Sequence, residues 1–487
     1  MQTRGLTRRD LLRRFFGAAT LGALAPFAAN ACTSEEREPS ATRPKVVVVG
    51  GGAAGVMAAW LLDGRYDVVL LEREAQLGGN VQGFTWEQGG LQATVDVGAQ
   101  YFHPGPYPTY TKLLELLDLY HPGAESDADA YAAPSSISIL GLGEENPRFV
   151  SPLLPDRGWP LTALWNSTAI GAFATITREA RAWDKDGDWS VTVEDWLQTL
   201  SLSDEARAQV LEPWIASLYS GDIAQGRSLS ARAALVFLSR ATTDNPLENV
   251  SYYTLTQGLG EALRRMVADC QTLDVRLNAK VVGLTRQGEQ IQVRLEDGGE
   301  VVADHLVLAS HPEVSSRLLA DLAGSEAQRA ALDQVQSHDA TLLLHTDPIY
   351  AHADPKNWSF LNCLVREGYC EASMQLAAAV RPLSNGAPVA LWKSWATHRA
   401  QDPADILHRV EYRHILPTPA TLRGQDALRP LQGEGGVWFV GGWTMPFDAQ
   451  ETALLSAWSV AEALGSLETP HALALGELLA QEPADEA

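Results

Sequence analysis

The 487-residue chain has few cysteines, fewer basic than acidic residues, and no apolar run long enough for a comfortable transmembrane helix. Its four cysteines lack the spacing of a metal site, and no disulfide framework is indicated, although a single Cys363–Cys370 bridge stays open. Only 37 Lys and Arg accompany 60 Asp and Glu, and the net charge of −23 argues against nucleic acid as a partner, which requires a basic surface. No internal repeat is apparent. The length suits two or three globular domains.

The basic residues cluster only once, near the N-terminus. Thr7–Leu12 contains a twin-arginine pattern, and Phe15–Ala29 is a short apolar stretch that leads into a small-x-small cleavage pattern. Residues 1–31 are therefore predicted to be a twin-arginine export signal, and residues 32–44 a linker. We expect the machinery for folded proteins to export the chain to the periplasm or cell envelope. An uncleaved membrane anchor and lipidation of Cys32 stay open, and either would tether the protein to the membrane.

The segment from residue 45 to residue 80 predicts a βαβ unit. Val46–Val49 is a β-branched run typical of a strand that is buried on both faces, and it leads directly into a glycine loop. Ala53–Leu62 has helix-forming residues, and Val68–Leu71 is a second β-branched run.

The glycine loop has the spacing of a dinucleotide-binding turn. Gly50 permits a tight turn, Gly52 lets the backbone approach a pyrophosphate, and Gly55 lets the helix pack against the strand. The phosphates would then lie at the positive end of the helix, near Ala53–Ala54. Glu72 stands 22 positions after Gly50, where a carboxylate can accept hydrogen bonds from a ribose. A glycine-rich turn that binds nothing is the alternative.

Further motifs carry a resemblance to a known family. The Glu72-x5-Gly78-Gly79 element followed by Asp96-x-Gly98 resembles the FAD-binding amine-oxidase-like superfamily, which includes amine oxidases, protoporphyrinogen oxidases and phytoene-type desaturases. The segment VDVGAQYFHPGPYPTYTKLLELLDL is similar to a bacterial branch of NAD/FAD-binding oxidoreductases. The resemblance continues in residues 256–268, 275–284, 305–311, 437–443 and 451–457.

The resemblance implies an α/β fold, with a Rossmann-like FAD-binding domain, built from a parallel sheet and a βαβ unit, and an interleaved α+β substrate domain. It implies FAD as the cofactor, and non-covalent binding is expected because no Cys or His occupies a convincing attachment position near the final motif. The implied cofactor-binding residues are Gly50, Gly52, Ala53, Ala54, Gly55, Glu72, Arg73, Gly78, Gly79, Asn80, Gly98, Ala99, Gln100, Val281, Ser310, Gly441, Gly442, Glu451, Thr452 and Ala453. Val281 is expected to meet the adenine through its backbone, and the helix that starts near Glu451 is expected to point at the flavin.

The same motifs divide the chain into alternating parts. The predicted FAD-binding domain comprises residues 45–104, 250–311 and 424–466. The predicted substrate domain comprises residues 105–249 and 312–423, and residues 467–487 form an acidic C-terminal tail.

The chain departs from the superfamily at the positions that amine oxidases use to bind and oxidise an amine. The lysine that amine oxidases carry near the flavin is expected on the strand around residues 340–344, where the nearest counterpart is Thr341; Lys393 is expected to lie elsewhere. No aromatic pair that would sandwich an amine can be placed. The catalytic residues therefore stay open, with Trp443, His311 and Lys393 as candidates.

These observations predict an exported FAD-dependent oxidoreductase. It would transfer a hydride from an amine-like or lipid-like small molecule to the flavin, with oxygen or a quinone as the acceptor. One alternative is a desaturase or isomerase of an apolar chain. The other is an exported flavoprotein with a binding or assembly role.

Overall fold

The computed structural model describes residues 43–123, 129–133, 136–150, 167–241, 252–376 and 390–480. The predicted export signal, Cys32 and most of the linker lie outside these ranges, as do the last seven residues of the predicted acidic tail.

A five-stranded parallel sheet organises the cofactor-binding part. Its strands, in spatial order, are β19 (Val437–Phe439), β13 (His305–Leu308), β1 (Lys45–Val49), β2 (Asp67–Leu71) and β9 (Asp274–Arg276). Val46 and Val48 contact one hydrophobic core and Val47 and Val49 another, because successive side chains point to opposite faces. The predicted buried strand and the βαβ unit are confirmed.

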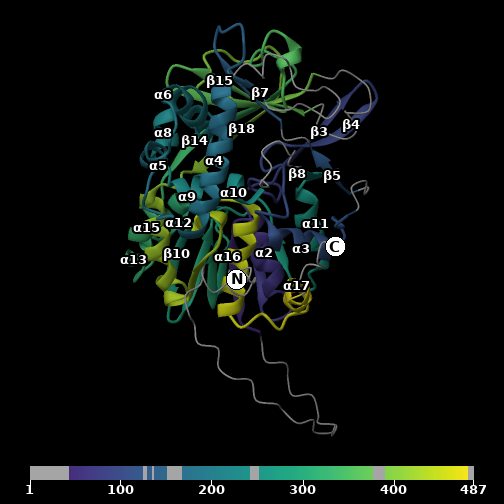
Figure 1. The fold of residues 1–487 in the computed structure, drawn as a ribbon. Helices are drawn as coiled ribbons and strands as arrows, with labels where there is room; N and C mark the ends of the chain where they lie inside the picture. The colour runs from purple at the N-terminus through teal and green to yellow at the C-terminus, as the bar shows by residue number, and fades with distance from the viewer. Residues whose placement is uncertain are drawn as a thin grey trace. The chain divides into compact units, whose positions relative to one another are not determined.

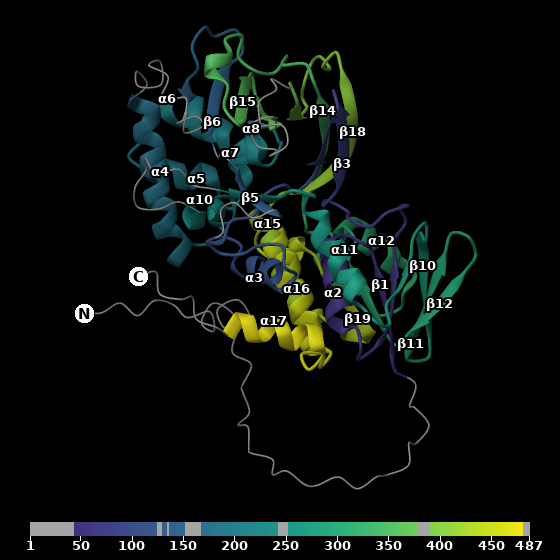
Figure 2. The same ribbon diagram turned by 90° about the vertical axis from the view of Figure 1, so that its right-hand side faces the viewer.

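Helices cover the first face of this sheet. They are α2 (Ala53–Leu62), α3 (Pro108–Leu116), α11 (Gly260–Asp269), α16 (Gln450–Ala463) and α17 (Pro470–Ala480). Figure 1 and Figure 2 show α2 and α16 side by side. Helix α17 lies within the predicted tail, yet it buries Ala472 and Leu475 in this core. Ala/Leu-rich residues of the tail thus cover apolar surface.

The second face packs against a three-stranded antiparallel sheet and further helices. The strands are β10 (Val281–Gln287), β11 (Gln290–Leu295) and β12 (Glu300–Ala303); the helices are α12 (Pro312–Leu318), α13 (Glu326–Leu332) and α15 (Pro419–Leu428). Leu319 and Leu332 share this core with Val437. Residues 312–335 therefore pack with the cofactor-binding part, although the prediction placed them in the substrate domain.

A seven-stranded mixed sheet forms the other large element. Its strands, in spatial order, are β18 (Ile406–Ile415), β14 (Ser337–His345), β17 (Trp392–Trp395), β16 (Tyr369–Gln375), β15 (Leu361–Arg366), β6 (Ile137–Gly141) and β7 (Phe149–Val150). One face packs against the hairpin of β3 (Gly83–Gln88) and β4 (Leu91–Asp96). Strands β5 (Ala130–Ala133) and β8 (Tyr252–Leu255) form a separate pair.

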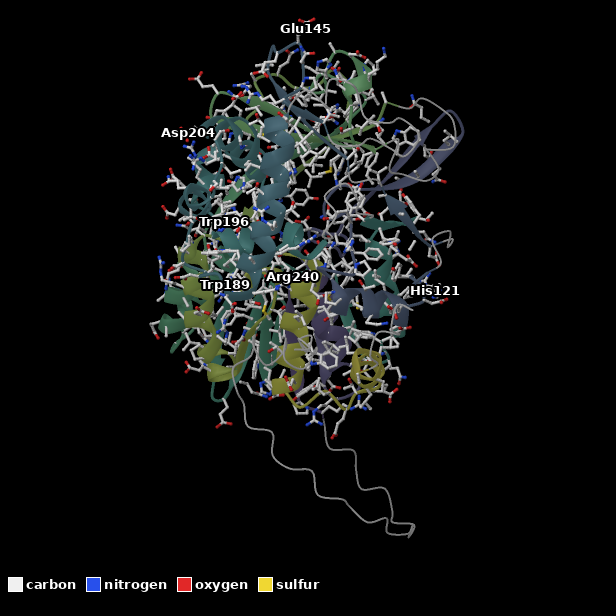
Figure 3. All side chains as sticks on the ribbon, in the orientation of Figure 1. His121, Glu145, Trp189, Trp196, Asp204 and Arg240 are labelled. Carbon is white, nitrogen blue, oxygen red and sulfur yellow. The ribbon has the colours of Figure 1, made fainter. Side chains whose placement is uncertain are left out.

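A helical layer covers the other face of the mixed sheet. It contains α4 (Ser167–Asp186), α5 (Val193–Thr199), α6 (Asp204–Ala206), the π-helix Arg207–Leu211, α7 (Glu212–Leu218), α8 (Ile223–Ser228), α9 (Ala231–Ala234) and α10 (Val236–Ala241). Trp196, labelled in Figure 3, and Trp214 are buried in this layer, as expected for tryptophans that pack a core. Cys363 and Cys370 are buried here with free thiols. Within the described ranges, no helix is both long and apolar enough to cross a membrane.

Candidate functional site

The glycine loop between β1 and α2 is held by close backbone contacts. Gly50 has a φ of +111° and donates its N–H to the carbonyl of Leu71 at 2.9 Å. A Cβ added at Gly50 would lie 2.9 Å from the carbonyl oxygen of Ala309, and one added at Gly55 would lie 1.9 Å from that of Gly50. The packing of the loop against α2 and β13 therefore requires glycine at both positions.

Gly52 has a different reason to be glycine. A Cβ added there would lie 3.7 Å from the Cα of Gly79, an ordinary van der Waals contact, so the packing of the protein does not by itself require glycine at this position. Gly52 is also the N-cap of α2 and supplies no side-chain hydrogen bond, which leaves N–H groups at Ala53 and Ala54 for an outside acceptor. An open glycine cradle on a helix N-terminus fits a pyrophosphate.

Glu72 lies at the end of β2, next to this loop. Its buried carboxylate accepts the N–H of Gly51 at 2.6 Å and the N–H of Glu74 at 2.9 Å. Its backbone carbonyl accepts the N–H of Ala279 at 2.7 Å, which brings the segment that leads to Val281 to the same edge. Arg73 is exposed and pairs with Glu74 at 2.9 Å, so its side chain points away from the loop.

The remaining cofactor motifs meet at the glycine loop. Gly78 donates its N–H to the carbonyl of Gly51 at 2.9 Å, and a Cβ added at Gly79 would lie 3.0 Å from the Cα of Gly52. Asn80, whose side chain is exposed, accepts the N–H of Ala99 through its carbonyl at 2.8 Å. The structure thus brings the glycine loop, the Gly-Gly turn and the Asp-x-Gly motif together.

Three buried polar atoms lack a partner beside the Asp-x-Gly motif. They are the amide oxygen of Gln100 and the hydroxyl groups of Tyr101 and Tyr412, none of which hydrogen-bonds to any residue in the described ranges. Buried polar groups are almost always paired in native proteins. Orphaned atoms at this place indicate a bound ligand with polar edges, which fits the ring system of FAD.

Lys393 lies at the same motif. It is 2% exposed on β17, and its Nζ donates to the carbonyls of Asp96 at 3.1 Å and Gly98 at 3.2 Å. Burial lowers the pKa of this lysine, opposed by the nearby charge of Asp96. Burial raises the pKa of Asp96, whose carboxylate accepts the N–H of Leu259 at 3.1 Å. As expected, Lys393 is not on the strand of Thr341; it lies on β17, which pairs with β14, and its side chain reaches the Asp-x-Gly motif.

Two aromatic side chains lie on the same face of the mixed sheet as Lys393. Trp395 follows it by two residues on β17, and Tyr412 is on β18; their ring centroids are 6.1 Å apart at 71°. The hydroxyl of Tyr412 lies 3.0 Å from where a Cβ of Gly98 would be. Sequence reasoning missed this pair, because only the register of three strands places it beside the cofactor motif. Thr341 instead bonds Glu411 on the exposed side of β14.

The last motif presents a helix N-terminus. Gly441 donates its N–H to the hydroxyl of Ser456 at 2.9 Å, and Thr452 accepts the N–H of Ala449 at 3.0 Å. The carboxylate of Glu451 turns toward α3, where it accepts the N–H groups of Thr109 at 3.1 Å and Tyr110 at 2.7 Å. Burial raises the pKa of Glu451 to about 7. The side chain of Glu451 therefore ties α3 to α16.

The other two catalytic candidates, Trp443 and His311, have roles in packing and in capping a helix. Trp443 is buried in the core with Val437 and Phe439, and its carbonyl accepts the side-chain amide of Gln425 at 2.8 Å. His311 is the N-cap of α12, after Ser310, whose hydroxyl bonds that of Ser315. Burial, with the charge of Arg413, lowers the pKa of His311 to about 4, so its imidazole is neutral near pH 7.

Asp448 is a further acidic group that the sequence prediction did not single out. Part of its side chain is accessible to solvent. The surrounding protein atoms nevertheless displace much of the water around its carboxyl, and this desolvation raises the pKa of the carboxyl to about 6. It makes no hydrogen bond or ion pair with any described residue. A Cβ added at Gly442 would lie 2.0 Å from its Oδ1. Its position just before α16 was the only available signal.

Aromatic side chains lie near Asp448. Burial raises the pKa values of Tyr107 and Tyr219, and the negative charge of Asp448 adds to both shifts. The neighbouring Phe447 contacts Phe237 edge-on at 5.7 Å, and Tyr107 stacks on the same Phe237 at 5.7 Å. These aromatic residues come from the start of α3, the end of α7, α10 and the segment before α16.

Known proteins share sequence and fold with this chain. Residues 53–344 match the family model for flavin-containing amine oxidoreductases. An uncharacterised protein of Acanthamoeba polyphaga mimivirus is 43% identical over 75 residues, and the match spans 15% of this chain and 15% of that relative.

Solved structures with low identity share the fold. Cyclohexylamine oxidase from Brevibacterium oxydans IH-35A is 16% identical with a TM-score of 0.58, covering 87% of this chain and 100% of its own. A putrescine oxidase bound to putrescine is 14% identical with a TM-score of 0.58, covering 87% and 99%. A CLA-producing fatty acid isomerase from P. acnes is 12% identical with a TM-score of 0.61, covering 87% and 99%. Since the family model spans more than half of the chain, the protein belongs to the flavin-containing amine oxidoreductases and is an FAD-dependent oxidoreductase.

Proposed function

We propose that this enzyme oxidises a small organic amine whose positively charged nitrogen is held by Asp448. The observation that carries the proposal is the unpartnered, accessible carboxylate of Asp448, which lies beside Gly442 and near aromatic side chains. Aromatic faces attract cations as well as apolar carbon, so this surrounding suits an alkylammonium group. Solved oxidases of putrescine and cyclohexylamine have the same fold.

Different residues of the chain bind the cofactor, position the backbone beside it and bind the donor. The loop around Gly52 and the N-terminus of α2 bind the pyrophosphate, and Glu72 lies where it can bind the ribose. Bound FAD supplies the hydride acceptor. Lys393 holds the carbonyls of Asp96 and Gly98 in place, and the rings of Trp395 and Tyr412 form an aromatic wall beside them. Asp448 orients the donor.

The setting of the reaction is also a proposal. Oxygen or a membrane quinone takes the electrons from the reduced cofactor, and the enzyme works in the periplasm or cell envelope after export in its folded state. The twin-arginine pattern at Thr7–Leu12 supports export, because a tightly held cofactor is inserted before a folded protein crosses the membrane. Lipidation of Cys32 would add a membrane tether.

The test is anaerobic reduction of the bound flavin by three donors: a linear diamine, a cyclic monoamine and an unsaturated fatty acid. We expect an amine to bleach the oxidised flavin. The substitution Asp448→Asn should raise the donor concentration for half-maximal reduction by ~10–100-fold, since hydrogen bonds to charged groups contribute about 1.5–3 kcal/mol. Asp426→Asn, at an exposed ion pair with Arg429, is the matched control and should change nothing.

The pH dependence gives the second readout. The carboxyl of Asp448 has a pKa raised to about 6, so it is ionised above this pH and neutral below it. The apparent affinity for a cationic donor should therefore fall as the pH decreases through 6, and Asp448→Asn should remove this step. Reduction by the fatty acid alone would instead support the apolar-chain alternative and contradict the amine proposal.

A further inference from the structure

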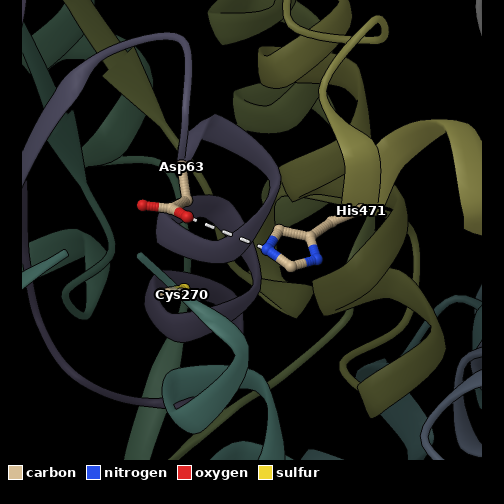
Figure 4. A group of neighbouring side chains, drawn as sticks. All are labelled: Asp63, Cys270 and His471. Atoms are coloured by element: carbon tan, nitrogen blue, oxygen red, sulfur yellow. Dashed lines mark ion pairs between the residues drawn. The ribbon is translucent and has the colours of Figure 1, made fainter. Parts of the chain in front are cut away.

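Three potential metal ligands lie together at the end of α2 that faces away from the glycine loop. Asp63 follows α2, Cys270 follows α11, and His471 lies in the first turn of α17 (Figure 4). A carboxylate oxygen, the thiol sulfur and a ring nitrogen of these residues all lie within 4.8 Å of one another. Cofactor binding uses none of the three, because Gly52 and Asp63 are at opposite ends of the helix.

The carboxylate of Asp63 is fixed in orientation by its neighbours. Its Oδ1 accepts the N–H of Thr272 at 2.9 Å and the hydroxyl of Thr272 at 2.7 Å. Its Oδ2 accepts the N–H of Gln271 at 2.8 Å and faces Nε2 of His471 at 3.8 Å. Oδ2 accepts one hydrogen bond from the backbone and keeps a second lone pair on the atom that faces the imidazole. Hydrogen-bonded partners that orient a ligand in this way are typical of metal sites.

The imidazole and the thiol are also positioned. The ring of His471 stacks on Trp60 with centroids 4.7 Å apart and planes 24° apart, which directs Nε2 toward Asp63. The thiol of Cys270 donates to the carbonyl of Met266 at 3.3 Å. The charge of Asp269 acts on both Cys270 and His471 and makes the surroundings favourable for a cation. Cys270 and His471 are only partly buried, so an ion can reach them.

We propose that Asp63, Cys270 and His471 bind one Zn²⁺, with water as the fourth ligand. Nitrogen, sulfur and oxygen donors are the set that zinc takes in proteins. Tetrahedral zinc bonds of ~2.0–2.1 Å hold a nitrogen and an oxygen ligand roughly 3.3 Å apart, so the 3.8 Å between Asp63 and His471 needs only a small side-chain rotation. The thiol proton of Cys270 leaves to solvent as the S–Zn bond forms. The ion joins the ends of α2, α11 and α17.

The experiment uses the FAD-loaded protein, purified without a metal-affinity tag, stripped with a chelator and titrated with Zn²⁺ or Co²⁺. We expect one Zn²⁺ per chain after desalting and a rise of a few degrees in the midpoint of thermal unfolding that saturates at one equivalent. Co²⁺ should give the visible absorption of a tetrahedral thiolate complex at wavelengths beyond the flavin bands. These readouts do not depend on turnover, so a negative result here does not bear on the amine proposal, and failure of the amine proposal does not bear on the zinc site.

Variants identify the ligands. Cys270→Ser should abolish the thiolate–cobalt absorption, and His471→Gln should weaken Zn²⁺ binding by at least ~10-fold. His121→Gln is the matched control, since His121 pairs with Asp118 at 3.1 Å on the surface. Absence of the thiolate–cobalt band in the unmodified protein overturns the proposal, even if a variant fails to fold. Equal Zn²⁺ binding in Cys270→Ser also overturns it and indicates adventitious binding to the acidic surface.

Discussion

At the scale of single residues, Lys393 has the most unusual surroundings in the site. Its ammonium group contacts two backbone carbonyls of the Asp-x-Gly segment, and the nearest opposite charge belongs to Asp96, which is itself buried. Burial lowers its pKa from the ordinary value of 10.5, because the charged form loses its hydration. The lysine therefore changes charge at a pH where an unperturbed lysine would stay protonated.

Lys393→Met should remove this ionisation from the pH profile of flavin reduction and slow reduction by roughly 100-fold, the lower end of the range for groups that take part in proton transfer. The flavin content should stay near that of the unmodified enzyme, since Lys393 does not hold the pyrophosphate. Stopped-flow absorbance at a series of pH values measures the rate of flavin reduction and its pH profile. Lys356→Met is the control, since Lys356 lies in an exposed turn. An unchanged profile in Lys393→Met would show that the lysine has only a packing role.

At the scale of elements, the junction of β1, the glycine loop and α2 decides whether FAD binds. A Cβ at Gly55 would lie 1.9 Å from the carbonyl oxygen of Gly50, so the turn and the first turn of α2 would have to separate. Gly55→Ala should therefore yield protein with less than roughly a tenth of the normal flavin content, if the lost contacts cost more than ~1.4 kcal/mol of binding free energy. Absorbance ratios after desalting measure this content.

The matched control is a glycine in a helix where a side chain fits. Gly171 lies in α4, and a Cβ added there meets nothing within 4 Å. Gly171→Ala should keep full flavin content and stabilise the helix by up to ~1 kcal/mol, because alanine has the higher helix propensity. Normal flavin content in Gly55→Ala would contradict the packing argument.

The helices and strands also show which features of the fold can be predicted from local sequence pattern and which cannot. The pattern around Val46–Val49 and the spacing of Gly50, Gly52 and Gly55 predicted a βαβ unit that the structure contains, because each feature depends on neighbours in sequence. The position of β17 next to β14 could not be predicted in this way, since the strands are about fifty residues apart and pair only through tertiary packing. The contact of Lys393 with the Asp-x-Gly motif therefore could not be predicted from local pattern.

At the scale of the whole molecule, the proposed export requires that the protein folds and binds FAD before it crosses the membrane. Replacing the arginine pair with Arg8→Lys and Arg9→Lys should retain flavin-loaded enzyme in the cytoplasm, because the twin-arginine route depends on that pair. Cell fractionation with activity assays and absorbance spectra measures the distribution. A parallel Arg13→Lys and Arg14→Lys variant keeps the same charge and should be exported normally. Equal export of both variants would contradict the predicted signal.

The sequence by itself determined the buried parallel strands, the glycine cradle and the family, because these depend on short-range periodicity and on motifs of contiguous residues. Tertiary structure alone decided which side chains meet. It placed Lys393 and Tyr412 beside Gly98, brought Asp448 near aromatic residues, turned Glu451 toward α3, and brought Asp63, Cys270 and His471 together. The physical reason is that strand register and helix packing bring together residues that are tens to hundreds of positions apart, and no local pattern records that proximity.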